Sequence, residues 1–273
     1  MHIRLIALRS HRPRHDGSFC LYENDGTSQA PGGGFRARQG CHVGSRPAGS
    51  NEEALIGTSP RITESLKVKK QQDHWEKVYR SKPSETVSWF QEHATRSLDM
   101  IRSIGATSDT QIIDVGGGAS TLVDDLLTSG YKHISVLDLS ESALEVVRAR
   151  LGPLNQNITW MAGDIRTVDL PALTYDVWHD RAVFHFLTEP ADRMAYVRQA
   201  IKAVKPGGHL IVATFAADGP EQCSGLPVCR YDHNQLHAEF GPQFELLEYA
   251  SEDHKTPWGS IQRFVYCHFL APH

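Results

Sequence analysis

A buried strand that breaks into glycines, at residues 112–118, constrains the fold of this chain more than any other feature. Its apolar half has the β-branched residues typical of a strand covered on both faces: Ile112, Ile113 and Val115. Three consecutive glycines follow: Gly116, Gly117 and Gly118. A loop without Cβ atoms lets a ligand touch the backbone, and the apolar spacing after it predicts a helix. This order of elements is typical of a nucleotide-like ligand held at the carboxyl edge of a parallel sheet.

The same loop argues against two kinds of phosphate site. A dinucleotide fingerprint needs a third glycine three positions after its second, and Thr121 stands there. No Lys-Ser or Lys-Thr pair follows the glycines, which excludes a Walker-type phosphate cradle. A flexible turn that holds no ligand is the simplest alternative reading of three glycines.

Acidic residues mark three successive predicted strands. Asp114 lies in the first, Asp138 ends the second over 134–138, and Asp164 follows the third in the stretch 158–165. An acid at the tip of the second strand can accept hydrogen bonds from both hydroxyls of a ribose. The residues after Asp138 also suit a plain helix N-cap, so this acid alone does not identify a ligand.

Asp114, Gly116 and Gly118 form an Asp-x-Gly-x-Gly pattern, and with the two later acids the chain resembles the class I S-adenosylmethionine (SAM)-dependent methyltransferases. The resemblance covers about residue 73 to the C-terminus and implies SAM as the cofactor. In this family Asp164 faces the adenine amino group and Ile165 packs near the ring. The resemblance thus implies a cofactor pocket made by the following residues: Asp114, Gly116, Gly117, Gly118, Asp138, Leu139, Asp164, Ile165 and Asp180.

The family fold also organises the rest of the chain. A fourth strand is expected over 176–180 and a fifth over 209–215, separated by a helix that stops at the Lys-Pro-Gly-Gly turn 205–208. A helix over 232–240 and strands over 244–249 and 261–269 complete the series. The resemblance implies a Rossmann-like α/β fold: a seven-stranded, mostly parallel sheet with an antiparallel last strand and helices on both faces.

Residues 67–273 are expected to form this domain, and residues 1–66 an extension of another kind. The extension is rich in Arg, Pro and Gly and has almost no apolar periodicity, so it is predicted to be disordered. An organelle transit peptide, a nucleic-acid-binding tail and a true start further along the chain are the alternatives.

Composition limits the class of partner. The net charge of −4 gives no case for a stable nucleic-acid partner, and no apolar run is long enough for a membrane span. The five cysteines are an odd number, which is typical of reduced thiols and predicts a cytoplasmic protein. The sequence pattern does not set the oligomeric state.

The segment after the fourth strand is expected to face the methyl group. Transfer from a sulfonium is an in-line displacement, so alignment of the reactants can supply most of the acceleration. His185 is the first candidate for a general base, because an imidazole titrates near neutral pH. A core histidine in an aromatic cluster is the equal alternative. Asp180 is a further catalytic candidate, or part of the pocket wall, or a partner of Arg181.

This segment lacks the motifs of two other methyltransferase types. Enzymes that methylate amide or exocyclic amino nitrogens carry Asn or Asp, two prolines and an aromatic residue here. The DNA cytosine enzymes carry a nucleophilic Cys after a Pro. Neither pattern occurs in residues 180–187, which argues against methylation of DNA bases or glutamine.

Residues 219–231 are punctuated by Gly and Pro and are predicted to form a lid over the site. Arg230 is a candidate to fix an anionic group of the substrate, beside Tyr231. Capture of a soft metal or metalloid by Cys223 and Cys229 is an alternative, but their spacing matches no common zinc pattern and no metal site is expected.

Trp75 and Tyr79, one helical turn apart, are expected to lie on one face of a cap over SAM, or to be buried against the sheet. The sequence therefore predicts a SAM-dependent methyltransferase with a small-molecule substrate. Protein lysine is the nearest other acceptor, and a non-catalytic SAM- or nucleoside-binding regulatory protein is the alternative of another class. A dehydrogenase is disfavoured by Thr121.

Overall fold

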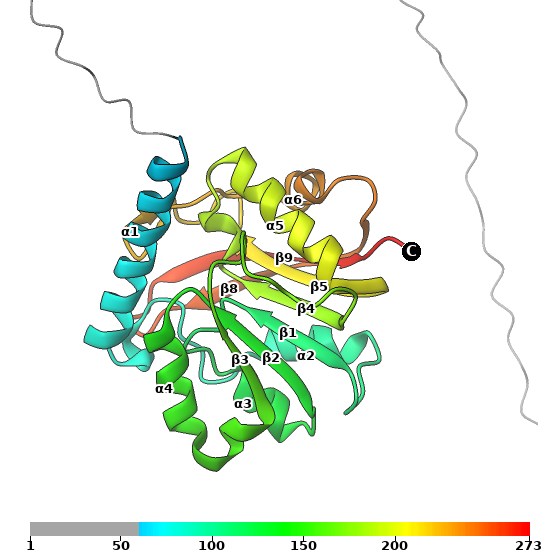
Figure 1. Ribbon diagram of the computed structural model, residues 1–273, viewed down its shortest axis with the longest axis horizontal. Coiled ribbons are helices and arrows are strands. Elements are labelled where there is room, and N and C mark those ends of the chain that lie inside the picture. The colour runs from blue at the N-terminus through cyan, green and yellow to red at the C-terminus, as the bar shows by residue number, and fades with distance from the viewer. Residues whose placement is uncertain (1–59) are drawn as a thin grey trace, which may run out of the picture. The chain divides into compact units, whose positions relative to one another are not determined.

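The structure, a computed structural model, describes residues 60–273, with side chains from residue 66 onward (Figure 1). The disorder predicted for residues 1–66 therefore lies outside the described residues up to position 59. Helix α1 runs from Pro60 to Ser81, so the boundary drawn at 66/67 falls inside a helix. The physical reason is that extending a helix costs far less than starting one.

A seven-stranded sheet forms the centre of the described domain, in the order β3-β2-β1-β4-β5-β9-β8. Strands β1 to β5 are parallel neighbours, and β9 is antiparallel to both β5 and β8. The expected fold class is confirmed, including the antiparallel last strand. The strands are β1 Gln111–Val115, β2 His133–Asp138, β3 Ile158–Ala162, β4 Tyr175–Arg181, β5 Val204–Phe215, β8 Glu245–Lys255 and β9 Ile261–Leu270.

Helices cover both faces of the sheet (Figure 1). One face buries an aromatic cluster beneath α5 and α6, in which Trp178, Tyr196 and Phe240 are fully buried. The other face buries aliphatic residues of α2, α3 and α4, among them Ile101, Leu122 and Val147. The helices are α2 Thr95–Ser103, α3 Leu122–Thr128, α4 Glu141–Leu151, α5 Pro190–Ala203 and α6 His233–Phe240, with short 3-10 turns at Ser84–Thr86, Gly152–Asn157 and Phe184–Phe186.

The β5 strand begins earlier than the sequence predicted. Helix α5 ends at Ala203, just before the Lys-Pro-Gly-Gly turn, as expected. The residues of this turn then belong to strand β5, because Val204 already pairs with Tyr175 of β4. The register between the two strands shifts after this pair, and pairing resumes at Val177 and His209.

Because strands β1 to β4 run parallel, their carboxyl ends meet at one edge of the sheet. The loops that follow them carry the predicted site residues. Between β5 and α6 the chain forms a small two-stranded sheet, β6 Gln222–Cys223 with β7 Leu226–Pro227, inside the segment predicted as a lid. None of the helices within residues 60–273 is both long and apolar enough to cross a bilayer.

Candidate active site

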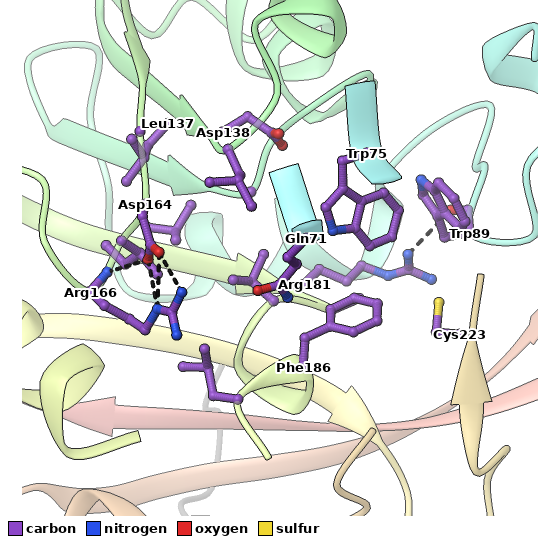
Figure 2. Close-up of a pocket in the computed structure, with 18 of the residues that line it drawn as sticks. Gln71, Trp75, Trp89, Leu137, Asp138, Asp164, Arg166, Arg181, Phe186 and Cys223 are labelled. Carbon is purple, nitrogen blue, oxygen red and sulfur yellow. Dashed lines mark hydrogen bonds and ion pairs between the residues drawn. The ribbon is translucent and has the colours of Figure 1, made fainter. Parts of the chain in front are cut away.

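A pocket opens at the carboxyl ends of β1, β2 and β4, next to the loop after β3 (Figure 2). The empty space between its side chains amounts to about 800 Å³, open solvent at the mouth included. Its lining includes five predicted cofactor residues: Gly116, Asp138, Leu139, Asp164 and Ile165. Asp114 and Gly117 line a second, smaller hollow on the other side of the glycine loop.

The glycine loop is fixed by close contacts. Gly116 has a φ of +68°, and a Cβ there would lie 1.9 Å from Cγ2 of Val183. Gly118 has a φ of +41°, and a Cβ there would lie 2.8 Å from Oδ2 of Asp138. The Gly116 N–H donates to the carbonyl of Leu137 at 2.6 Å. The glycines thus let strand β1 turn tightly against its neighbours, which argues against a merely flexible turn.

Asp114 is buried beneath this loop. Its Oδ1 lies 2.7 Å from Nδ1 of His179, and Nε2 of His179 lies 2.8 Å from Oγ of Ser97. Sequence reasoning missed His179, although it stands directly opposite Asp114 in the register of β1 and β4. The arrangement holds the Asp114 carboxylate in place behind the loop.

Asp138 presents a carboxylate to the pocket at the end of β2. Burial raises its pKa to about 7, and the nearby Asp114 charge adds to the rise. One oxygen accepts a hydrogen bond from the Ser140 N–H at 2.8 Å, while the Ser140 side chain caps helix α4 through the Ala143 N–H. The helix-cap reading therefore applies to Ser140, and Asp138 remains available to accept hydroxyl donors.

Asp164 lines the same pocket at the end of β3, paired with Arg166. The Arg166 guanidinium donates to Asp164 at 2.9 Å and also pairs with Asp192 of α5 at 2.9 Å. Sequence reasoning missed Arg166, which orients the carboxylate. Leu139 and Ile165 add apolar surface beside the two acids.

Asp180 does not line the pocket. It is fully buried, and its carboxylate accepts hydrogen bonds from the N–H groups of Val183 and Phe184 at 2.9 and 3.1 Å and from the Tyr196 hydroxyl at 2.6 Å. Burial raises its pKa to about 6. Asp180 therefore shapes the turn after β4, and it does not pair with Arg181 in the structure.

His185 also lies outside the pocket lining. The ring is completely buried against Phe186 and Phe215, with centroid distances of 4.5 and 4.8 Å. Burial and the nearby Arg181 charge lower its pKa to about 3. A base must reach its proton and titrate near the working pH, so the geometry favours the core-histidine reading. Ala182 has a φ of +74°, and in the turn that follows Val183 lines the pocket while Phe184 and His185 are buried.

Of the residues singled out in the predicted lid segment, Cys223 lies at the pocket and Arg230 and Cys229 do not. Arg230 donates to the Gly219 carbonyl at 3.0 Å and pairs with Glu221 at 3.1 Å, and it does not line the pocket. Cys223 lines the pocket, whereas Cys229 lies near Arg193. Within residues 66–273 no group of three or more His, Cys, Asp or Glu side chains is placed to hold a metal ion.

The roof of the pocket comes from helix α1, and its role as a cap over SAM stays a prediction. Gln71, Trp75 and Tyr79, at successive helical turns, line it, and Trp75 meets Trp89 and Phe186 edge-on at 5.6 and 5.2 Å (Figure 2). Hydrogen bonds connect helix α1 to the segments on both sides of the pocket. Glu76 accepts a hydrogen bond from the Glu141 N–H at 2.8 Å, and His74 bonds Ser224 of the lid segment at 3.1 Å.

Arg181 is a pocket residue to which sequence reasoning gave no cofactor or substrate role of its own. Its side chain extends from the end of β4 toward Trp89, where Nη1 donates to the Trp89 carbonyl at 3.2 Å (Figure 2). Its Nε donates to the Tyr266 hydroxyl at 2.9 Å, and the guanidinium lies over the Phe264 ring at 4.3 Å.

These groups fit an adenosine-type cofactor. Ribose hydroxyls and an adenine amino group are donors, and Asp138 and Asp164 are acceptors at two neighbouring strand ends. An adenine ring needs apolar walls, which Leu139 and Ile165 supply. The raised pKa of Asp138 shows a carboxylate that gains from hydrogen-bond donors.

Comparisons with known proteins agree with this geometry. A family model described as a methyltransferase domain matches residues 112–208. A ubiquinone/menaquinone biosynthesis C-methyltransferase of Roseobacter denitrificans is 29% identical over 109 residues, 39% of this chain and 42% of that protein. A malonyl-[acyl-carrier protein] O-methyltransferase of Halalkalibacterium halodurans is 33% identical over 125 residues, 44% of this chain and 45% of that protein. The matches thus span less than half the length of these two relatives.

A eukaryotic relative and a solved structure extend the comparison. The EEF1A lysine methyltransferase 2 of Danio rerio is 24% identical over 166 residues, 58% of this chain and 65% of that protein. The structure of a Burkholderia thailandensis 1,6-didemethyltoxoflavin N1-methyltransferase with S-adenosylhomocysteine bound has a TM-score of 0.58 at 13% identity, covering 79% of this chain and 92% of that one. The domain match shows a methyltransferase domain over residues 112–208, and the strand order and the solved structure show the class I SAM-dependent methyltransferase fold around it.

Proposed function

We propose that this protein transfers a methyl group from SAM to a small-molecule acceptor. The observation that carries the proposal is the covered pocket, in which the two acids of the cofactor side and the aromatic roof of α1 face one space. A concave pocket with apolar walls and a few convergent polar groups suits a small acceptor. One of the relatives named above is an enzyme of ubiquinone and menaquinone biosynthesis, which supports the same acceptor class.

The residues have distinct tasks in this proposal. Asp138 would hold the ribose hydroxyls, and Asp164 with Ile165 would hold the adenine. SAM supplies an electrophilic methyl group on a sulfonium. The aromatic faces of Trp75 and Phe186 exclude water from the space in which an acceptor must be aligned.

None of the three predicted catalytic side chains, Asp180, His185 and Arg230, lines the pocket. We infer that alignment of the acceptor supplies most of the rate enhancement, and that the acceptor needs no protein base with an ordinary pKa. The buried Asp180 and His185 support the pocket wall from behind.

Protein lysine is the second candidate acceptor. The longest of the sequence alignments given above is to a lysine methyltransferase, and this observation favours lysine. A cytoplasmic location is part of the proposal, supported by the free thiols of Cys223, Cys229 and Cys267.

The experiment that tests the proposal is transfer of labelled methyl from SAM into a cell extract divided into small-molecule, protein and nucleic-acid fractions. Label among small molecules supports the proposal, and label on protein moves the assignment to lysine. Asp138→Ala should abolish transfer by weakening SAM binding, whereas Arg102→Gln, at an exposed position of α2, should not. Unchanged SAM affinity of Asp138→Ala in titration calorimetry would contradict the site assignment.

A further inference from the structure

Arg181 carries a positive charge that makes no direct ion pair with a carboxylate of the described chain. Its Nε and Nη1 bond two neutral groups, and its Nη2 is buried without a hydrogen-bond partner in residues 66–273. None of its contacts in that part of the chain is an ion pair within 4.0 Å. Arg166, across the same pocket, instead pairs with two acids. Since a sequestered charge is costly unless it is paired, Arg181 lacks a partner that a ligand can provide.

The groups in direct contact with this guanidinium are neutral or apolar. Burial raises the pKa of both the Tyr266 hydroxyl and the Cys223 thiol to about 12, so neither is an anion near neutral pH. The buried His254 nearby has a lowered pKa because of burial and the Arg181 charge itself. Glu252 is the acid of this region, and it helps to raise the pKa of the Tyr266 hydroxyl that Arg181 bonds. Its Oε1 accepts a hydrogen bond from Gln91 at 2.7 Å, and it forms no direct ion pair with Arg181.

The guanidinium lies at the side of the pocket away from the cofactor acids. Figure 2 shows Asp164 and Arg166 on one side, and the end of the Arg181 side chain on the other, between Trp89 and Cys223. The walls between are aromatic, since Trp75 and Phe186 face this space. An aromatic wall next to a single unpaired guanidinium suits a planar molecule that bears one negative group.

We propose that Arg181 binds an anionic group, a carboxylate, on the methyl acceptor, and so selects planar or aromatic acids. The inference rests on the proposed function and names its substrate class. Arg181 also disfavours the lysine alternative, because an ammonium group brought beside it meets a like charge. The other carboxylate that could reach this side chain is that of the cofactor's amino-acid end, since Arg181 also borders the hollow beneath the glycine loop.

The first arm of the test uses the whole chain saturated with S-adenosylhomocysteine, titrated with benzoate and with its neutral analogue benzamide. We expect benzoate to bind at least about tenfold more tightly, as a charge-assisted hydrogen bond would give. Arg181→Gln should remove the preference, Arg181→Lys should restore part of it, and Arg102→Gln should leave it intact. Equal affinity for the two probes, or no binding of either, overturns the proposal. The wild-type comparison needs no variant, so a folding failure of Arg181→Gln does not affect it.

The second arm separates the two sources of a carboxylate. S-adenosylhomocysteine carries the amino-acid end, and 5′-methylthioadenosine lacks it. We expect Arg181→Gln to change the affinity for each less than threefold. A loss of tenfold or more for S-adenosylhomocysteine alone would assign Arg181 to the cofactor and overturn the proposal.

Failure of this proposal is distinguishable from failure of the proposed function. Small molecules from the extract are separated on an anion exchanger before the labelled-methyl assay. Label confined to the retained fraction supports an anionic acceptor, and label only in the flow-through contradicts it while methyl transfer stands. Carboxylate binding that depends on Arg181, together with no transfer into any fraction, sustains the anion site and refutes the enzyme activity.

Discussion

The buried carboxylate of Asp138 predicts an unusual dependence of stability on pH. Its pKa is about 7 in the folded protein, against about 3.9 in an unfolded chain. A raised acid pKa means that the folded state binds the proton more tightly, so stability falls as pH rises between these two values. At 1.36 kcal/mol for each pKa unit, the rise from pH 5 to pH 8 costs the wild type about 2 to 3 kcal/mol through this group alone.

Asp138→Asn removes this ionisation while keeping the shape of the side chain. We expect the stability of the variant relative to the wild type to increase by about 2 to 3 kcal/mol from pH 5 to pH 8. Urea unfolding at unit pH intervals measures the difference, in which all other titrating groups are shared. Asp109→Asn, at an exposed position, is the matched control and should show no such trend. A difference that stays constant within about 0.5 kcal/mol, the size of ordinary surface effects, would refute the reasoning.

The same carboxylate should make cofactor binding sensitive to pH. Ribose hydroxyls donate to the ionised form, so the wild-type affinity for S-adenosylhomocysteine should weaken about tenfold per unit below pH 7. Asp138→Asn should bind weakly and with a flat profile. A wild-type profile that is equally flat would mean that Asp138 does not contact the cofactor.

Three further changes test other parts of the site. Gly116→Ala should lower the free energy of unfolding by about 2 to 4 kcal/mol in urea unfolding, because a Cβ there overlaps Val183. Gly105→Ala, with a similar φ but open space, should lower it by only about 1 kcal/mol. Val183→Ala should restore part of the stability lost in Gly116→Ala, and equal losses for the two glycine variants would contradict the steric argument. His185→Leu should lower methyl-transfer kcat less than tenfold, whereas a hundredfold loss, typical of a missing base, would return His185 to catalysis. The buried thiol of Cys223, with a pKa near 12, should react slowly with iodoacetamide at pH 8, and rapid labelling traced by mass spectrometry would show that the pocket wall opens.

The fold could be predicted from the sequence because it depends on the order of strands and on their ends. Parallel strands bring Asp138 and Asp164 to one edge of the sheet whatever the details of packing, and the structure places both in one pocket. Ile165 and Gly116 line it too. Local patterns suffice where topology alone decides the position of a residue.

The acceptor side could not be predicted in the same way. After β4 the positive φ of Ala182 reverses the direction of the chain, so Arg181 reaches the pocket and His185 enters the core. Nothing in the order of these residues reveals that turn. Arg230 was expected to bind the substrate, but its guanidinium pairs with Glu221 of the same loop and does not line the pocket. The sequence pattern does not show which partner such a side chain selects.

Helix α1 is held over the pocket by the aromatic contacts of Trp75 and by polar links, through Glu76 to the start of α4 and through Lys67 to Asp192 of α5. Its Trp75 and Tyr79 lie above the space that a spent cofactor has to leave. We expect product departure to require transient detachment of this helix, which is a slower event than bond exchange at sulfur. The turnover rate would then depend on solvent viscosity and ionic strength, and the helix that covers the pocket would also set the rate-limiting step.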